Sequence, residues 1–98
     1  MKRAPAKEMA RMKEELYHDL AQGNIGIREA ARQMRKILGM SQKGYAQKVA
    51  DISPRILSEF ETGSGNPTLS TLEKIASPFG LKVSFLPPKS WRLNGQKE

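Results

Sequence analysis

Two short helical patterns separated by a tight turn lie between residues 41 and 63, and no other feature of the sequence limits the fold as strongly. Ser41 stands where its hydroxyl can cap the N-terminus of the first helix, and Ser53 can cap the second. Pro54 follows at the first helical position, where its missing N–H has no cost. Gly63 marks the end of the second helix. The stretch therefore predicts a helix, a turn and a second helix.

The second of these helices separates apolar from polar residues. Leu57 and Phe60 face one side, where a core is expected. The opposite side carries polar residues at i, i+3, i+4 and i+7, namely Arg55, Ser58, Glu59 and Thr62. A helix in the major groove of DNA needs short polar side chains, and arginine is the most common reader of guanine. This helix is therefore a candidate for base recognition.

Three more helices are predicted from apolar residues at helical spacing. The first spans about residues 6–21 and is expected to pack on the helical bundle, with a place in a dimer interface or the binding of a cognate protein as the alternatives. The second begins at Ile27 and ends at Gly39, whereas the third follows the capping residue Thr68 and ends near Pro78. The residues expected to face inward from these two helices are Ile27, Ala30, Ala31, Met34, Leu38, Leu69, Leu72, Ile75 and Ala76.

A single strand is predicted after the helices. Leu81, Val83 and Phe85 alternate with polar residues and precede two prolines. A lone strand leaves its N–H and C=O edges unpaired. Pairing with the same strand of a second copy satisfies these edges and buries the three apolar side chains. The sequence therefore predicts a homodimer.

The composition excludes several classes of protein. The chain has no cysteine and one histidine, His18, which excludes disulfide scaffolds and thiolate metal sites and disfavours a histidine zinc site. No nucleophile–base set and no cofactor loop is present, so we expect neither an enzyme nor a cofactor. No apolar run is long enough to cross a membrane, so we expect a soluble cytoplasmic protein without a membrane partner.

The formal net charge of +7 favours a polyanionic partner. DNA and RNA rank ahead of anionic lipid, and RNA is the weaker candidate because the sequence has no evident aromatic stacking platform. The positive surplus is not concentrated in the second helix of the pair, which is nearly neutral. The charge therefore predicts a general, salt-dependent attraction to the phosphate backbone, and specificity depends on a few residues around Arg55.

About half of the chain, residues 27–79, resembles the Xre/Cro/phage-repressor family of helix-turn-helix domains. The resemblance rests on Arg35, Gly39, Met40, Ser41, Gln42, Tyr45, Ala46, Ile52, Ser53, Pro54, Arg55, Leu57, Ser58, Glu61, Gly63, Pro67, Thr68, Leu69, Leu72, Ile75 and Ala76. It implies a lambda-repressor-like bundle of about five short helices, here with an extra N-terminal helix and one C-terminal strand, that binds double-stranded DNA.

The resemblance also implies roles for single residues. Pro54, Arg55 and Glu59 fall at base-reading positions, and we add Ser58, which lies on the same face. Contacts to the DNA phosphates are expected from Ser41, Gln42, Lys43, Ser53, Thr62 and Asn66. Arg35 and Glu61 match a partly buried ion pair that joins the first helix of the domain to the recognition helix. Arg28 and Arg32, by contrast, are expected on a solvated face.

Two departures from the family pattern bear on this interpretation. The connection from Ala46 to Ile52 is one residue longer than usual, so either the turn is altered or the preceding helix is extended. The reading face has few cations, and Glu59 repels phosphate unless it accepts from a cytosine amino group. This pattern favours selective binding over indiscriminate binding, with weak DNA contact as the alternative.

Residues 65–72 and 78–86 resemble the end of HipB-like antitoxins and related short regulators, in which a strand pairs across two subunits. A two-fold dimer places its recognition helices about 34 Å apart, so the operator is expected to be an inverted repeat. We therefore expect a transcriptional repressor, with an antitoxin of a HipA-like kinase toxin as the alternative.

The expected organisation is an N-terminal tail and extra helix over 1–22, a helix-turn-helix domain over 23–80, a dimerisation strand over 81–88 and a flexible tail over 89–98. Trp91, in that tail, is either a tail residue or an anchor for a partner.

Overall fold

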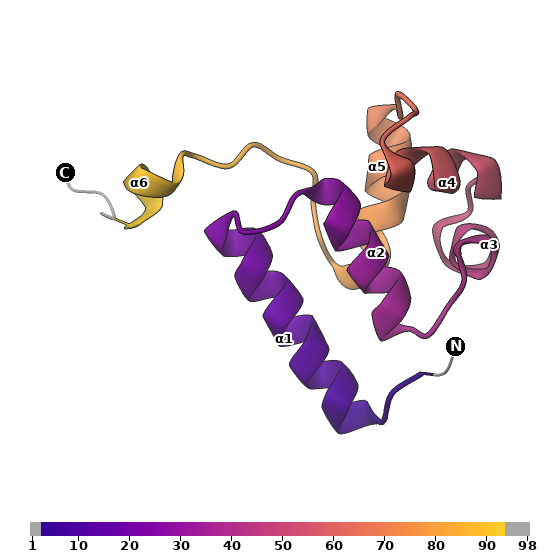
Figure 1. The fold of residues 1–98 in the computed structure, drawn as a ribbon, viewed down its shortest axis with the longest axis horizontal. Helices are drawn as coiled ribbons and strands as arrows, with labels where there is room; N and C mark the ends of the chain where they lie inside the picture. Colours follow the sequence, from indigo (N-terminus) through magenta and orange to yellow (C-terminus); the bar gives the residue numbers. More distant parts are fainter. Residues whose placement is uncertain (1–2, 94–98) are drawn as a thin grey trace.

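Every regular element among residues 3–93, the part of the chain that the computed structural model describes, is helical (Figure 1). The α-helices are α1 (Ala6–Gln22), α2 (Ile27–Ile37), α3 (Gln42–Gly44), α4 (Pro54–Thr62), α5 (Leu69–Ala76) and α6 (Lys89–Leu93). A π-helix, η1 (Tyr45–Ala50), continues directly from α3, and a 3-10 turn, η2 (Ser77–Phe79), continues from α5. The expected all-α bundle is therefore confirmed.

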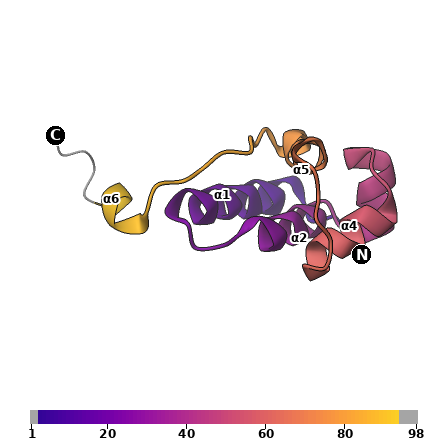
Figure 2. The ribbon, with the colours of Figure 1, turned by 90° about the horizontal axis from the view of Figure 1, so that it is seen from above.

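The N-terminal helix α1 is an integral part of the bundle. It lies beside α2 in both views of the ribbon (Figures 1 and 2). Its Leu16 is fully buried, and Met9, Met12 and Leu20 pack against the core. The Tyr17 hydroxyl donates to the Phe79 carbonyl at 2.9 Å, which joins α1 to the end of η2. The expectation that this helix packs on the bundle is confirmed.

The core is built from apolar residues of every helix from α1 to η2 except the short α3. Its buried members are Leu16, Ala30, Ala31, Met34, Ile37, Tyr45, Ala46, Ala50, Leu57, Phe60, Ile75 and Phe79. Two residues expected inside are outside, since Ile27 is 53% exposed and Leu69 is 59% exposed. Each is the first residue of its helix, and because side chains tilt toward the helix N-terminus, theirs point past its end.

The strand expected over residues 81–88 does not form in the single chain. These residues have no regular secondary structure and run as an extended arm away from the bundle (Figures 1 and 2). Leu81 packs against the core, but Val83 is exposed and Phe85 is fully exposed. Because no strand occurs among residues 3–93, this arm has no edge within its own chain with which to pair.

A short helix, α6, follows the arm where the sequence predicts a flexible tail. Lys89 donates from Nζ to Oδ1 of Asn24 at 2.9 Å, which links the start of α6 to the loop after α1. Trp91 lies in α6 and is exposed. The rest of the expected tail, residues 94–98, lies outside the described residues. No helix formed by residues 3–93 is both long and apolar enough to cross a membrane.

Candidate functional site

The helix pair that the sequence predicts between residues 41 and 63 is present, with both of its caps. The Ser41 hydroxyl accepts a hydrogen bond from the Gly44 N–H at 3.0 Å. The Ser53 hydroxyl accepts from the N–H groups of Arg55 and Ile56, at 3.1 and 3.4 Å. These bonds satisfy backbone donors that have no partner inside the first turn of a helix. They fix where α3 and α4 begin.

The connection between these two helices carries its additional residue as a π-helix. After one turn of α3 the chain widens into η1, and Tyr45 and Ala46 remain buried. Asp51 then takes a left-handed conformation, with φ 58° and ψ 51°, before α4 begins. A π-turn accommodates one more residue than an α-turn, and such turns often occur at functional sites. Of the two alternatives, an altered turn or an extended helix, the structure therefore has the extended helix, which continues from α3 as the π-helix η1.

Helix α4 has one buried face and one exposed face, as expected. Leu57 and Phe60 are buried, whereas the Arg55 side chain is 86% exposed. Arg55 Nε donates to Glu59 Oε2 at 3.0 Å, one turn further along the same face. Ile56, which the sequence analysis did not single out, is also exposed beside Arg55. Its position at the border of the polar face was the one available signal.

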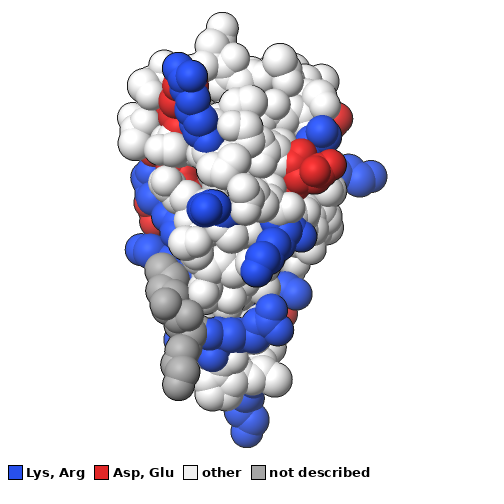
Figure 3. Space-filling view, turned by 90° about the vertical axis from the view of Figure 1, so that its right-hand side faces the viewer, with Lys and Arg blue, Asp and Glu red and all other residues white. Residues whose placement is uncertain are grey.

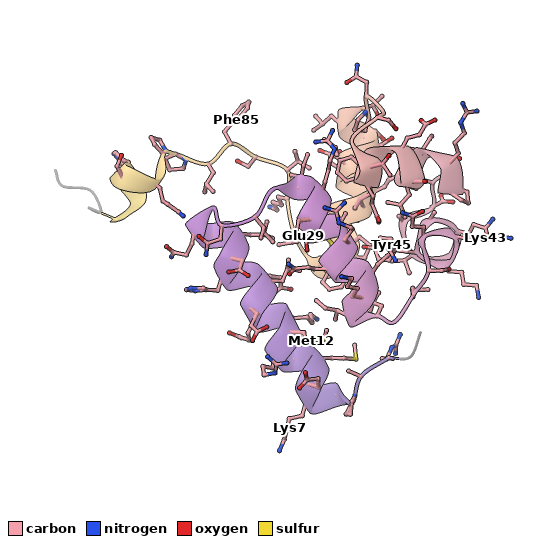
Figure 4. The ribbon with its side chains drawn as sticks, viewed as in Figure 1. Lys7, Met12, Glu29, Lys43, Tyr45 and Phe85 are labelled. Atoms are coloured by element: carbon pink, nitrogen blue, oxygen red, sulfur yellow. The ribbon has the colours of Figure 1, made fainter. Side chains whose placement is uncertain are left out.

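The residues expected to contact phosphate surround the two ends of the helix pair. Lys43 projects outward from α3 (Figure 4), and Asn66 is exposed in the loop after α4. The Gln42 amide nitrogen donates to Glu61 Oε1 at 2.9 Å, so one of its two hydrogens is used inside the protein. The Thr62 hydroxyl donates to the Ser58 carbonyl at 3.0 Å, which occupies its single hydrogen.

Arg35 and Glu61, the expected ion pair, join α2 to α4 in a two-pronged contact. Arg35 Nε and Nη2 donate to the two carboxylate oxygens of Glu61, each at 2.9 Å. The side chains are only 12% and 2% exposed. Arg35 Nη1 also donates to the Met40 carbonyl at 3.2 Å. Such a paired geometry offsets the loss of hydration that burial of both charges entails.

Two further arginines of α2 contact the end of α4, which corrects the expectation of a solvated face. Arg28 Nε donates to the Phe60 carbonyl at 2.9 Å, and its guanidinium lies 5.3 Å from the centre of the Phe60 ring. Arg32 Nη1 donates to the Glu61 carbonyl at 2.5 Å. We call Arg28, Arg32 and Arg35 the arginine row. Arg28 and Arg32 supply donors and positive charge to carbonyls at the negative end of the α4 dipole.

Glu29 orients the middle member of the arginine row. It accepts hydrogen bonds from Gln33 Nε2 at 3.3 Å and from Arg32 Nε at 3.1 Å. The hydrogen bond from Gln33, followed by that from Arg32, lowers the pKa of the Glu29 carboxyl from its ordinary value. The carboxylate is therefore held in its charged form beside Arg32.

On the face of the molecule where α3 and α4 lie, the charged side chains are mostly basic (Figure 3). Lysine and arginine side chains spread over it, and acidic side chains gather in only a few places on this face. A surface of this kind attracts a polyanion over a range set by the ionic strength. The exposed face of α4 thus lies within a field that favours phosphate.

Comparisons with known proteins agree with this geometry. A model of the helix-turn-helix family matches residues 32–86, from the arginine row to the arm. A stretch of 58 residues is 40% identical to the HTH-type transcriptional regulator DdrOP3 of Deinococcus deserti. This match covers 59% of the chain and 44% of that relative, so the chain spans less than half of the length of the relative. No solved structure matches.

Proposed function

The chain belongs to the helix-turn-helix family, and we propose that it is a sequence-specific DNA-binding regulator of transcription that acts as a dimer on an inverted-repeat operator. Helix α4 enters the major groove in this proposal. The similarity to a transcriptional regulator from Deinococcus deserti supports the regulatory role.

The observation that carries the proposal is that the inner and outer faces of α4 have different roles. Its inner face is buried, and its C-terminal carbonyls are held by the arginine row. Its outer face presents Arg55 on a basic side of the molecule. Base recognition in the major groove requires a helix that is held firmly in place and exposes side chains such as arginine.

The base contacts are assigned to the outer face of α4. Arg55 reads guanine, Pro54 and Ser58 approach neighbouring bases, and Glu59 tunes selectivity. The exposed Ile56 is suited to the methyl group of thymine, an apolar contact that base recognition often uses.

The backbone contacts are assigned to residues at the rim of the helix pair, namely Ser41, Gln42, Lys43, Ser53, Thr62 and Asn66. The two capping serines accept from backbone N–H groups and keep their own hydroxyl hydrogens for a phosphate oxygen. Gln42 keeps its second amide hydrogen. Thr62 has to release the Ser58 carbonyl before it can donate to a phosphate.

A gel shift on the DNA upstream of the chain's own operon is the direct test. We expect that duplex to be bound more tightly than random duplexes at moderate salt, with affinity that falls as salt rises. Equal binding to specific and random DNA at every salt concentration contradicts the proposal.

The base-reading role of Arg55 predicts how a truncated variant behaves. Arg55→Ala is expected to cost about 1–3 kcal/mol of binding free energy and to relax the sequence preference at one base pair. Lys43→Ala is the matched control, because loss of a phosphate contact weakens binding to all sequences alike. A gel-shift panel of single-base operator variants measures both. If Arg55→Ala weakens binding to all sequences equally, Arg55 contacts the DNA phosphate backbone and does not read a base.

The dimer is proposed to form through the arm. Val83, Phe85 and Leu86 are exposed there, next to backbone groups that pair with no strand among residues 3–93. Pairing of two arms in an intermolecular ribbon buries these side chains and satisfies both edges.

The same arm is the feature on which the antitoxin alternative rests. In that alternative the protein also neutralises a HipA-like kinase toxin. Co-expression with the product of a neighbouring kinase-like gene tests it, and failure of the two proteins to co-purify removes this candidate.

A further inference from the structure

We propose that Glu59 is a positioning residue, which holds the Arg55 guanidinium in the orientation that reads guanine and does not itself read a base. This inference rests on the proposed function. It concerns the group formed by Arg55, Glu59 and Gly65 on and beside the recognition helix.

The contact between the two side chains leaves the reading edge of the arginine open. Arg55 Nε donates to Glu59 Oε2 at 3.0 Å, and no other hydrogen bond of the guanidinium occurs among residues 3–93. The two Nη groups of the 86% exposed side chain therefore keep their four hydrogens. Two of these point in parallel from the end of the guanidinium, in the geometry that matches O6 and N7 of guanine.

The backbone of Glu59 is held by several hydrogen bonds at the end of α4. Its carbonyl accepts from the N–H groups of Ser64 and Gly65, at 3.0 and 3.3 Å. The Gly63 N–H also bonds there as the helix ends. The loop after α4 is thereby folded back against the residue that carries the carboxylate.

Gly65 lies close to the side chain of Glu59. A Cβ atom at position 65 would lie 3.1 Å from Glu59 Cβ and 3.5 Å from Glu59 Oε1. The φ angle of Gly65 is not in the left-handed region, so a larger residue is opposed here by close contact and not by backbone conformation. Glu59 thus contacts Arg55 through its carboxylate and leaves little room for a side chain at position 65.

This arrangement also accounts for an acidic residue on a face that approaches DNA. An unpaired carboxylate repels phosphate, but a carboxylate bonded to Arg55 offsets the charge of its partner. An arginine fixed in this way loses less side-chain freedom when it binds a base. The pair therefore favours one base over others and does not raise the affinity for DNA in general.

The test compares the base preferences of variants in one selection experiment. Random-sequence duplexes are bound by the full chain, and the bound sequences are counted for the wild type, Arg55→Ala, Glu59→Gln and Glu73→Gln. Glu73→Gln is the matched control, because it removes the same charge from an exposed position on α5. We expect Glu59→Gln to reduce the guanine preference about tenfold, at the base pair whose preference Arg55→Ala abolishes. Glu73→Gln should leave that preference unchanged.

A glycine variant separates position from charge. Gly65→Ala keeps every charge but pushes Glu59 away from its place, so we expect it to lower the same guanine preference by a smaller factor. Gly26→Ala is its control, because a Cβ atom there meets nothing within 4 Å. Circular dichroism shows whether each variant is folded.

Three outcomes decide the matter. If Glu59→Gln changes the preference at a different base pair, Glu59 reads a base directly and the inference is wrong. If it leaves the guanine preference unchanged, or sharpens it, the pair does not position Arg55 and the inference is equally wrong. If the wild type itself enriches no sequence, the proposed function fails instead.

Discussion

Glu61 is the one charged residue that is buried among residues 3–91, and both of its carboxylate oxygens are occupied. Arg35 and Gln42 donate to it from α2 and α3, while its own helix is α4. A buried carboxylate with this set of donors stabilises the fold only while all of them are in place. The consequences of single substitutions at this point are therefore large.

Removal of the Glu61 charge tests this dependence. Glu61→Gln leaves the guanidinium of Arg35 nearly buried without an anion, and we expect the free energy of unfolding to fall by about 3–5 kcal/mol. Urea denaturation at neutral pH measures the change. Glu73→Gln, on an exposed position, should stay within about 0.5 kcal/mol of the wild type. A loss below about 1 kcal/mol for Glu61→Gln would class the pair with exposed salt bridges.

Tyr45 gives the stability of the protein a dependence on alkaline pH. Its hydroxyl donates to the Ile75 carbonyl at 2.8 Å, and burial raises the pKa of the phenol from 10.0 to about 12. Above pH 10 the unfolded chain loses this proton while the folded chain keeps it. The contribution of Tyr45 is therefore complete below pH 10 and is lost as the pH rises toward 12.

The comparison with Tyr45→Phe isolates this contribution, because all other titrating groups are common to both proteins. At neutral pH we expect the variant to be less stable by about 1 kcal/mol, since the Ile75 carbonyl loses its donor. The difference should shrink when denaturation is repeated at about pH 11. A difference that stays constant across this range contradicts the assigned pKa.

Among the arginines of α2, the sequence was informative about the one that contacts a side chain and uninformative about the two that contact backbone carbonyls of another helix. Arg35 and Glu61 could be paired through the family resemblance, because both partners are visible as charged residues. Arg28 and Arg32 could not, since their acceptors are the carbonyls of Phe60 and Glu61. Every residue has a carbonyl, so no sequence pattern distinguishes the ones that an arginine contacts.

At the scale of elements, the unusual feature is the π-helix between α3 and α4. The sequence revealed a connection one residue too long, but it left open whether turn or helix accommodates it. The structure places the additional residue inside the helix, where it keeps Tyr45 and Ala46 in the core. The choice depends on packing with α5, through Tyr45 and Ile75, and this packing cannot be derived from local spacing.

This assignment predicts an asymmetry between two single-residue deletions. Deletion of the exposed Gln47 from η1 should convert the π-winding to α-winding, preserve the helical circular dichroism signal and cost about 1–2 kcal/mol. Deletion of Gln33 from α2 should unfold the protein, because it rotates Arg35 away from Arg28 and Arg32 by one helical position. Thermal unfolding of both variants provides the measurement. An equal loss of thermal stability from the two deletions would show that η1 tolerates the loss of a residue no better than α2 does.

At the scale of the whole molecule, the chain consists of a closed helical bundle and an arm that leaves it. The alternation of Leu81, Val83 and Phe85 with polar residues predicted a strand, and the single chain forms none there. A strand needs a second edge, and no segment among residues 3–93 supplies one. Pairing of the arm therefore requires an edge from a second copy of the chain.

Phe85 is the residue with which to test it. Figure 4 shows its ring projecting from the arm, fully exposed to solvent. If two arms pair, Phe85→Ser should raise the dimer dissociation constant about thirtyfold, as loss of a buried aromatic anchor does. Lys82→Ser, on the alternate side of the arm, should change it little. Sedimentation equilibrium distinguishes the two variants, and a wild type that stays monomeric at high concentration contradicts the proposed dimer.

The way in which the arginine row holds α4 bears on how the recognition helix can evolve. Arg28 and Arg32 bond to main-chain oxygens, which any amino acid at positions 60 and 61 supplies. The side chains on the outer face of α4 take no part in these bonds. Under the proposed function, new operator preferences can therefore be acquired by exchange of surface residues alone, while the contacts that hold α4 stay the same. The domain is thus a scaffold on which a library of altered α4 outer faces can be displayed and selected for new target sequences.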